Sequence, residues 1–324
     1  MKFTISLEET TFKKKVSLIG AGFVGSTTAY ALMMKGLARE IVLVDANKKS
    51  ADGEILDLGH GIPSMGSANI YHGDYADCKD SDLIIISAGR GRKPNETRLD
   101  MAAGNLTIMK EILQNLSEHY NKGIIVLITN PVDIISHKAI EWTGLPFGKV
   151  FGTGCLLDSS RFIRAIADHL EVNTELVNAM VVGEHGDSQV PLWSKVTIAG
   201  FPIKDYCKAH KISFTEEDKA AIASKVKTMG ADIIDTKGKT HFGIATCVAS
   251  LADAILNGRT TIATVCTTLE GEYGVSDITV SVPCIVTNNG VEKRLTNGWD
   301  EKEIELFRDS ANKLKDVLET VDID

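Results

Sequence analysis

The stretch Lys15–Gly25, KVSLIGAGFVG, decides the fold, because a short apolar strand leads directly into a glycine-rich turn and a helix. Gly20, Gly22 and Gly25 form a G-x-G-x-x-G pattern. The first glycine suits a tight turn, the second lets backbone approach a pyrophosphate, and the third allows close packing of helix on strand. Free N–H groups at the start of the helix, around Phe23 and Val24, attract phosphate.

An acidic residue, Asp45, ends the next apolar strand. A carboxylate at this place accepts hydrogen bonds from both ribose hydroxyls and repels a 2′-phosphate, which favours NAD over NADP. A glycine turn without a ligand is the alternative, and the strand, the helix and the acid together argue against it.

Further apolar strands are predicted at residues 41–44, 82–87 and 124–129, and strands alternate with helices. Continuous apolar runs of this kind are typical of a doubly wound parallel sheet, the Rossmann fold. Beyond residue 155 we expect helices at 159–170, 216–234, 243–257 and 300–321, and shorter strands near 179–182, 262–265 and 279–286. The predicted organisation is an NAD-binding Rossmann domain over residues 1–155 and a mixed α/β substrate domain over residues 156–324.

Composition limits the class of protein. The chain has 324 residues, 44% hydrophobic and 24% charged, as in soluble globular proteins. A net charge of −8 argues against nucleic acid as the main partner. The six cysteines are scattered without a C-x-x-C pair, and no apolar run resembles a signal peptide or a membrane span. We therefore expect a reduced, cytoplasmic protein.

The loop SAGRGRKPNETR, residues 87–98, carries Arg92 and Arg98 six residues apart. Arg holds carboxylates through two parallel hydrogen bonds, so Arg92 and Arg98 suggest a small acidic substrate. The alternative is a pair of solvated loop charges.

A histidine between glycines, His185, lies in GEHGD, residues 183–187. If Asp158 contacts it, the carboxylate fixes the tautomer, raises the pKa of the imidazole and makes the pair a proton donor or acceptor. Arg161, one helical turn after Asp158, can share its face and hold a carboxylate. A buried structural histidine is the alternative.

These motifs, together with TNPVD at 129–133, LLDSSRF at 156–162 and GEHGDS at 183–188, occur in the order that resembles the L-lactate/L-malate dehydrogenase family. The resemblance implies hydride transfer between C4 of the nicotinamide and C2 of a 2-oxo or 2-hydroxy acid, in a homo-oligomer, with a tetramer favoured over a dimer. It implies that His185 transfers the proton, Asp158 is its partner, Arg161 anchors the substrate carboxylate and Arg98 polarises the carbonyl from a mobile loop. It also implies substrate contacts for Asn130 and Thr240, and cofactor contacts for Asn130, Ala88 and Gly89.

Arg92 falls where malate dehydrogenases resemble one another in having Arg and lactate dehydrogenases in having Gln. If pyruvate occupied the closed site, the Arg92 cation would have no anionic partner. An unpaired buried charge costs several kcal/mol, which corresponds to a selectivity of about a thousandfold against pyruvate. The stretches ETRLD (96–100), GEH, VPLW (190–193) and THFGI (240–244) instead resemble the lactate branch. We favour L-malate and oxaloacetate, with L-lactate dehydrogenase as the alternative.

Where fructose 1,6-bisphosphate-activated lactate dehydrogenases have Arg and His, this chain has Ile163 and Asn178. We therefore expect no activation by that sugar. A non-catalytic NAD sensor and an NAD-dependent glycosidase are the other classes considered. The sensor would not need His185, Asp158, Arg98 and Arg161 together, and no cluster has the spacing of the metal ligands that the glycosidase requires.

Overall fold

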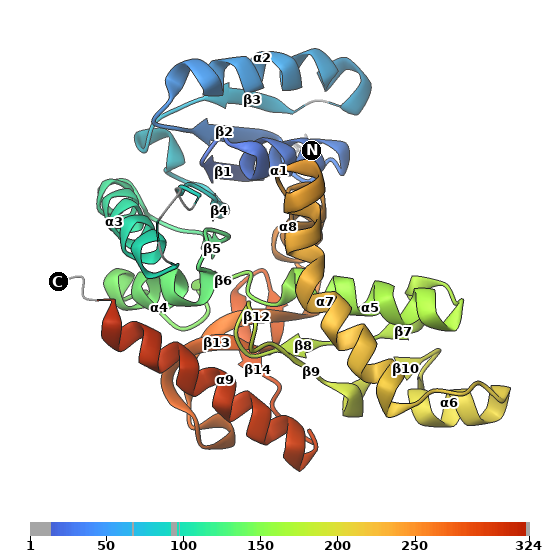
Figure 1. Ribbon diagram of the computed structural model, residues 1–324. Coiled ribbons are helices and arrows are strands. Elements are labelled where there is room, and N and C mark those ends of the chain that lie inside the picture. The colour runs from blue at the N-terminus through green and yellow to red at the C-terminus, as the bar shows by residue number, and fades with distance from the viewer. Residues whose placement is uncertain (1–13, 67, 92–95, 97, 322–324) are drawn as a thin grey trace, which may run out of the picture.

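The computed structural model describes residues 14–66, 68–91, 96 and 98–321. Over these residues the chain forms one nine-stranded sheet with helices on its faces, beside two smaller sheets of three and two strands (Figure 1). Arg92 and the side chain of Arg98 lie outside the described part.

Six parallel strands form the first portion of the large sheet. Their order in the sheet is β3-β2-β1-β4-β5-β6. From β1 the chain adds β2 and β3 on one side and then β4, β5 and β6 on the other, so the strand order switches between β1 and β4. This confirms the predicted doubly wound sheet and puts a ligand crevice at the carboxyl ends of β1 and β4. The strands are β1 (Lys15–Ile19), β2 (Glu40–Val44), β3 (Asn69–His72), β4 (Leu83–Ile86), β5 (Ile124–Leu127) and β6 (Val150–Gly152).

Three antiparallel strands extend the same sheet beyond β6. They are β12 (Thr261–Glu270), β13 (Ser276–Thr287) and β14 (Gly290–Arg294), and β12 meets β6 where Cys266 faces Gly152. The sheet thus continues across residue 155, and the division into domains at that residue stays a prediction.

Four of the helices precede residue 155 and five follow it in the described part of the chain, and they are labelled in Figure 1. The earlier ones are α1 (Phe23–Met34), α2 (Lys48–Met65), α3 (Arg98–Ser117) and α4 (Val132–Thr143). The later ones are α5 (Leu156–Leu170), α6 (Ile203–His210), α7 (Glu216–Lys237), α8 (Phe242–Asn257) and α9 (Glu301–Thr320). Within the described ranges none of them is long and apolar enough to cross a bilayer.

The ends of the later helices refine the predicted ranges. Helix α7 extends to Lys237, because Gly238 adopts the left-handed conformation (φ 87°) that ends a helix. Helix α9 begins with a capping box in which Asp300 and Glu303 exchange side-chain and backbone hydrogen bonds. The strand expected at 179–182 is shorter, with β8 (Val181–Val182) paired to β9 (Val190–Pro191).

The remaining elements are short. They are β7 (Val177–Asn178), β10 (Thr197–Ile198), β11 (Phe201–Pro202), and the 3-10 turns η1 (Ala76–Cys78), η2 (Thr174–Leu176), η3 (Trp193–Lys195) and η4 (Glu272–Gly274).

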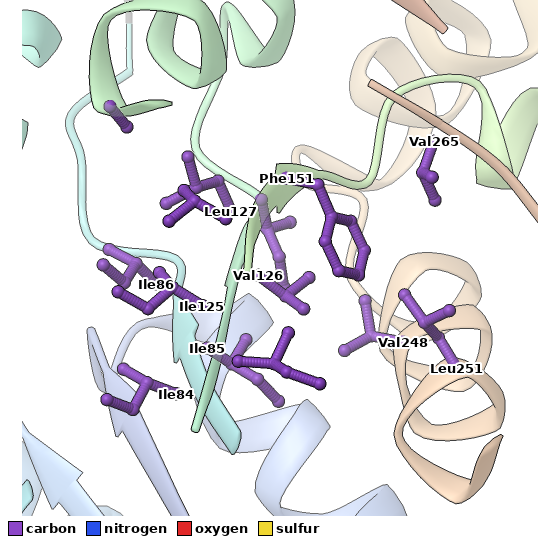
Figure 2. Close-up of a cluster of buried hydrophobic side chains, with 14 of the residues drawn as sticks. Ile84, Ile85, Ile86, Ile125, Val126, Leu127, Phe151, Val248, Leu251 and Val265 are labelled. Atoms are coloured by element: carbon purple, nitrogen blue, oxygen red, sulfur yellow. The ribbon is translucent and has the colours of Figure 1, made fainter. Parts of the chain in front are cut away.

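The main core lies on the large sheet and takes side chains from both halves of the chain (Figure 2). Strands β4 and β5 contribute the wholly apolar triplets 84–86 and 125–127, which meet Phe151, Val248, Leu251 and Val265. Burying a side chain of this size contributes about 1.5–3 kcal/mol. The strand ends that carry the site are therefore fixed by packing on both sheet faces.

A second core lies beneath α5 and α7. Phe162 on α5 is fully buried, and its ring meets the Trp193 ring edge-on at 4.7 Å between centroids. Ile222 and Val226 of α7 belong to the same cluster. This packing fixes the helix that carries Asp158 and Arg161.

Candidate active site and dinucleotide site

Two of the three glycines in the turn after β1 have no room for a larger residue. Gly20 has φ +110°, and a Cβ on it would lie 2.6 Å from the backbone nitrogen of Ala88. A Cβ on Gly25 would lie 1.8 Å from the carbonyl oxygen of Gly20. Gly22 differs, because nothing lies within 4 Å of its Cβ position, so space is open at the N-terminus of α1. The tight turn expected at Gly20 and the close packing expected at Gly25 fit this geometry, and the approach of a pyrophosphate to Gly22 stays a prediction.

Asp45 closes the other side of this turn. Its carboxylate accepts hydrogen bonds from the backbone N–H groups of Ala21 and Asn47, each at 2.7 Å. A cavity of about 890 Å³ extends from here, and Gly20, Gly22, Asp45, Ala88 and Gly89 are among the residues that line it. Phe23 and Val24 are the first two residues of α1, directly after Gly22. An open helix N-terminus next to an acid fits the diphosphate and ribose of NAD.

Two of the predicted catalytic residues, His185 and Asp158, lie in contact, and Asp158 also contacts the predicted substrate-binding Arg161. His185 Nδ1 is 2.5 Å from Asp158 Oδ2, and Arg161 Nη1 donates to Asp158 Oδ1 at 2.8 Å. The Asp158 side chain is 4% exposed, whereas that of His185 is 24% exposed. One buried carboxylate therefore orients two cationic side chains, and the imidazole stays accessible.

The electrostatics of the pair favour an imidazolium. Burial acts to lower the pKa of His185, but the charge and hydrogen bond of Asp158 outweigh it, and the pKa lies above its ordinary value. Burial acts to raise the pKa of Asp158, but His185 and Arg161 outweigh it, and the pKa lies below its ordinary value. The contact with Asp158 therefore favours the protonated imidazole over the neutral ring, and this proton is the one that the pair can give up.

The loop that carries His185 is held through its backbone. Gly183 exchanges two backbone hydrogen bonds with Ser281 of β13, and the N–H of Glu184 donates to Ser310 Oγ of α9 at 2.8 Å. The N–H of His185 donates to Asp133 Oδ2 of α4 at 2.8 Å. Neighbouring elements of both halves therefore fix the histidine.

A buried amide, Asn105 of α3, connects the cofactor loop to Asn130. Its Nδ2 donates to the carbonyl oxygens of Asn130 at 2.7 Å and Arg90 at 3.1 Å, and its Oδ1 accepts from the N–H of Arg90 at 2.8 Å. Asn130 itself precedes a cis peptide bond to Pro131. Sequence reasoning missed Asn105, since nothing around it in α3 marks it as a site residue.

The Arg90 side chain is held by two neighbouring groups. Its guanidinium pairs with Glu96 at 2.5 Å and donates to the carbonyl oxygen of Asp100 at 3.2 Å. It therefore links the end of β4 to Glu96 and to the first turn of α3.

Thr240 lies between α7 and α8, next to a ring stack. The neighbouring His241 shares a 3.0 Å hydrogen bond between its Nδ1 and Thr27 Oγ1. Its ring packs against those of Phe23 and Phe242. The described contacts do not join Thr240 to the group of His185, Asp158 and Arg161.

A second cavity, of about 510 Å³, adjoins His185. Asn130 and Asp133 line it from the α4 side, Leu99 from α3, and Val317 from α9. Within the described part of the chain, no three His, Cys, Asp or Glu side chains are placed to hold a metal ion.

Comparison with known proteins agrees with this geometry. Residues 14–152 match the model of the lactate/malate dehydrogenase NAD-binding domain, and residues 155–322 match that of the lactate/malate dehydrogenase alpha/beta C-terminal domain. A protein named L-lactate dehydrogenase from Acetivibrio thermocellus is 43% identical over 96% of this chain and 98% of its own length. The ligand-bound structure of minor L-lactate dehydrogenase from Enterococcus mundtii is 39% identical, with a TM-score of 0.93, and the match covers 97% of this chain and all of that one.

The chain belongs to the lactate/malate dehydrogenase family, and its cofactor is NAD. The expected family, fold and cofactor are confirmed. The preference for malate is not supported, because these relatives carry the name L-lactate dehydrogenase and so favour the alternative. Arg92, on which that preference depends, lies outside the described residues.

Two glycine substitutions separate packing from cofactor binding. We expect Gly25→Ala to lower the free energy of unfolding by more than about 2 kcal/mol, because the new methyl overlaps the Gly20 carbonyl. Gly22→Ala should leave the melting temperature nearly unchanged but weaken NADH binding about tenfold, as for one lost charged hydrogen bond. Thermal melts and NADH fluorescence titrations measure both, and equal effects of the two variants on stability would contradict the assignment.

Proposed function

We propose that this chain is an L-lactate dehydrogenase that interconverts pyruvate and L-lactate with NAD. The contact of His185 with Asp158 at 2.5 Å carries the proposal, because it supplies a proton donor beside a cation that can bind a carboxylate. The lactate dehydrogenase names of the relatives support pyruvate as substrate.

In the proposed mechanism, the imidazolium of His185 donates its Nε2 proton to the oxygen at C2 of the oxo acid. Asp158 holds the ring by Nδ1 and stabilises the positive charge before transfer. Held by Gly20, Gly22 and Asp45, NADH would supply the hydride to C2, and NAD would accept it in the reverse direction. Neutral His185 then takes the hydroxyl proton of the hydroxy acid.

Substrate binding is assigned to the arginines. Arg161 uses Nη1 for Asp158, and because a guanidinium has five N–H donors, it can hold the C1 carboxylate as well. Arg98 is proposed to polarise the carbonyl when its loop closes, and Asn130 and Thr240 to contact the substrate. Closure of the loop would exclude water from the site, and the exclusion of water would strengthen these charge contacts.

Replacing the proposed proton donor tests the mechanism. We expect His185→Asn to lower kcat by about a hundredfold to ten-thousandfold, the usual contribution of a positioned acid. NADH binding should stay close to that of the native chain, since His185 is not part of the cavity that Asp45 lines. The control is His210→Asn, at the exposed end of α6, and this variant should turn over normally. Normal turnover by His185→Asn would contradict the mechanism.

Malate dehydrogenase is the second candidate, and Arg92 is the observation that favours it. Steady-state rates with pyruvate and oxaloacetate, for the native chain and Arg92→Gln, distinguish the two. We expect the native chain to have the higher kcat/KM with pyruvate. A preference for oxaloacetate of about a thousandfold, lost in Arg92→Gln but kept in Lys93→Gln, would establish the malate reading instead.

We further propose a homotetramer that is active without an effector. Large apolar side chains such as Leu56 (64% exposed), Phe201 (63%) and Phe242 (62%) support association. Fructose 1,6-bisphosphate should change neither the mass measured by light scattering nor kcat/KM, because Ile163 and Asn178 offer its phosphates no charge. A large activation by the sugar, or an active monomer, would refute this proposal. The cytoplasmic location stays a prediction from the sequence.

A further inference from the structure

A second buried carboxylate, Asp133, lies at the His185 loop. Asp133 is the second residue of α4 and is 3% exposed. Oδ2 accepts the backbone N–H of His185 at 2.8 Å, and Oδ1 accepts the thiol of Cys266 on β12 at 2.9 Å. Because a buried charge needs hydrogen-bond partners, these donors and the N-terminus of α4 are what permit an ionised carboxylate here.

Asp133 differs in kind from the other anchors of this loop. Three successive N–H groups, from Gly183 to His185, donate to the Ser281 carbonyl, the Ser310 hydroxyl and the Asp133 carboxylate. The first two acceptors are neutral. Only the anchor of His185 can carry a charge, and it is placed under the residue whose charge changes in the reaction.

The charge of Asp133 acts on the imidazole. Burial raises the pKa of Asp133 to about 6, although hydrogen bonds from Cys266 and His185 oppose the rise, so the carboxylate is ionised at neutral pH. Its charge is one of the causes that raise the pKa of His185, after those of Asp158. His185 therefore lies between two carboxylates, one on its ring and one on its backbone.

Other titratable groups near Asp133 are accounted for. Burial and the Asp133 charge hold the pKa of Cys266 well above its ordinary value, and the pKa of Cys155 is raised in the same way with a further contribution from Asp158. Both thiols thus stay neutral over the working range. The charged groups that face Asp133, His185 or their shared cavity are Glu184, Asp158, Arg161 and Asp316.

We propose that Asp133 is a positioning residue for His185, which fixes the histidine backbone and supplies a second negative charge that favours the imidazolium, while the Cys266 thiol supports that carboxylate. This inference rests on the proposed proton transfer by His185. It assigns a role to a residue that touches neither the imidazole ring nor the guanidinium of Arg161 in the described contacts.

The test is the pH dependence of kcat/KM, measured with pyruvate and NADH and, in reverse, with L-lactate and NAD. Asp133→Asn keeps the size and an acceptor oxygen but removes the charge, so the imidazolium loses stabilisation. Reduction needs the imidazolium and oxidation the neutral ring. The reduction rate falls with rising pH and the oxidation rate rises, each with a pH midpoint. We expect both midpoints to lie about one pH unit lower in Asp133→Asn than in the native chain.

Matched variants separate charge from structure. Ser310→Ala removes the neutral anchor of the adjacent residue and should leave the pH midpoints in place, whatever it does to the rate. Cys266→Ser keeps a donor and should behave like the native chain. Cys266→Ala should shift the midpoints in the same direction as Asp133→Asn, and should add nothing in the Asp133→Asn background.

The outcomes distinguish this inference from the proposed function. A native chain that turns over neither oxo acid overturns the function itself. A native chain that is active, with an Asp133→Asn variant that is slower at unchanged midpoints, overturns the inference alone. An equal midpoint shift in Ser310→Ala also overturns it, because the effect would then follow from loop disorder and not from charge.

Discussion

The site depends on one buried carboxylate, Asp158, which binds two cationic side chains at once. Its oxygens take His185 at 2.5 Å and Arg161 at 2.8 Å. A carboxylate that is 4% exposed would be costly without both partners, and each cation is oriented because the carboxylate is fixed in helix α5. The packing of Phe162 and Ile166 beneath α5 therefore determines where a proton and a substrate carboxylate can meet.

Local patterns predicted much of the fold. Strand β1, the glycine turn and α1 follow from a continuous apolar run and three spaced glycines, and the later long helices from their periodicity. Helix α2 gives a weaker signal, because Ala51 is its one buried residue and its sequence contains Pro63. The contact of His185 with Asp158 could be inferred from the motifs, and so could the shared face of Asp158 and Arg161.

Contacts between distant residues that no motif connects could not be predicted in this way. Asp133 lies 52 residues from His185 and 133 from Cys266, and nothing in its surroundings, TNPVD, points to either partner. The links of Asn105 to Asn130 and Arg90 likewise depend on how α3 packs against the strand ends. The choice between malate and lactate depends on where a single side chain, Arg92, points in a closed site, which no local pattern determines.

The core drawn in Figure 2 limits how this protein can be divided or recombined. Val248 and Leu251 of α8 and Val265 of β12 belong to the same buried cluster as the strands of the cofactor half. A fragment that ended near residue 155 would lack α8 and β12. The apolar side chains that pack against them would be exposed, and β6 would become an unpaired edge strand, a template for aggregation. The two halves are thus not interchangeable modules: a cofactor half taken from a relative would function only if its surface also matched the α8 and β12 of the new partner.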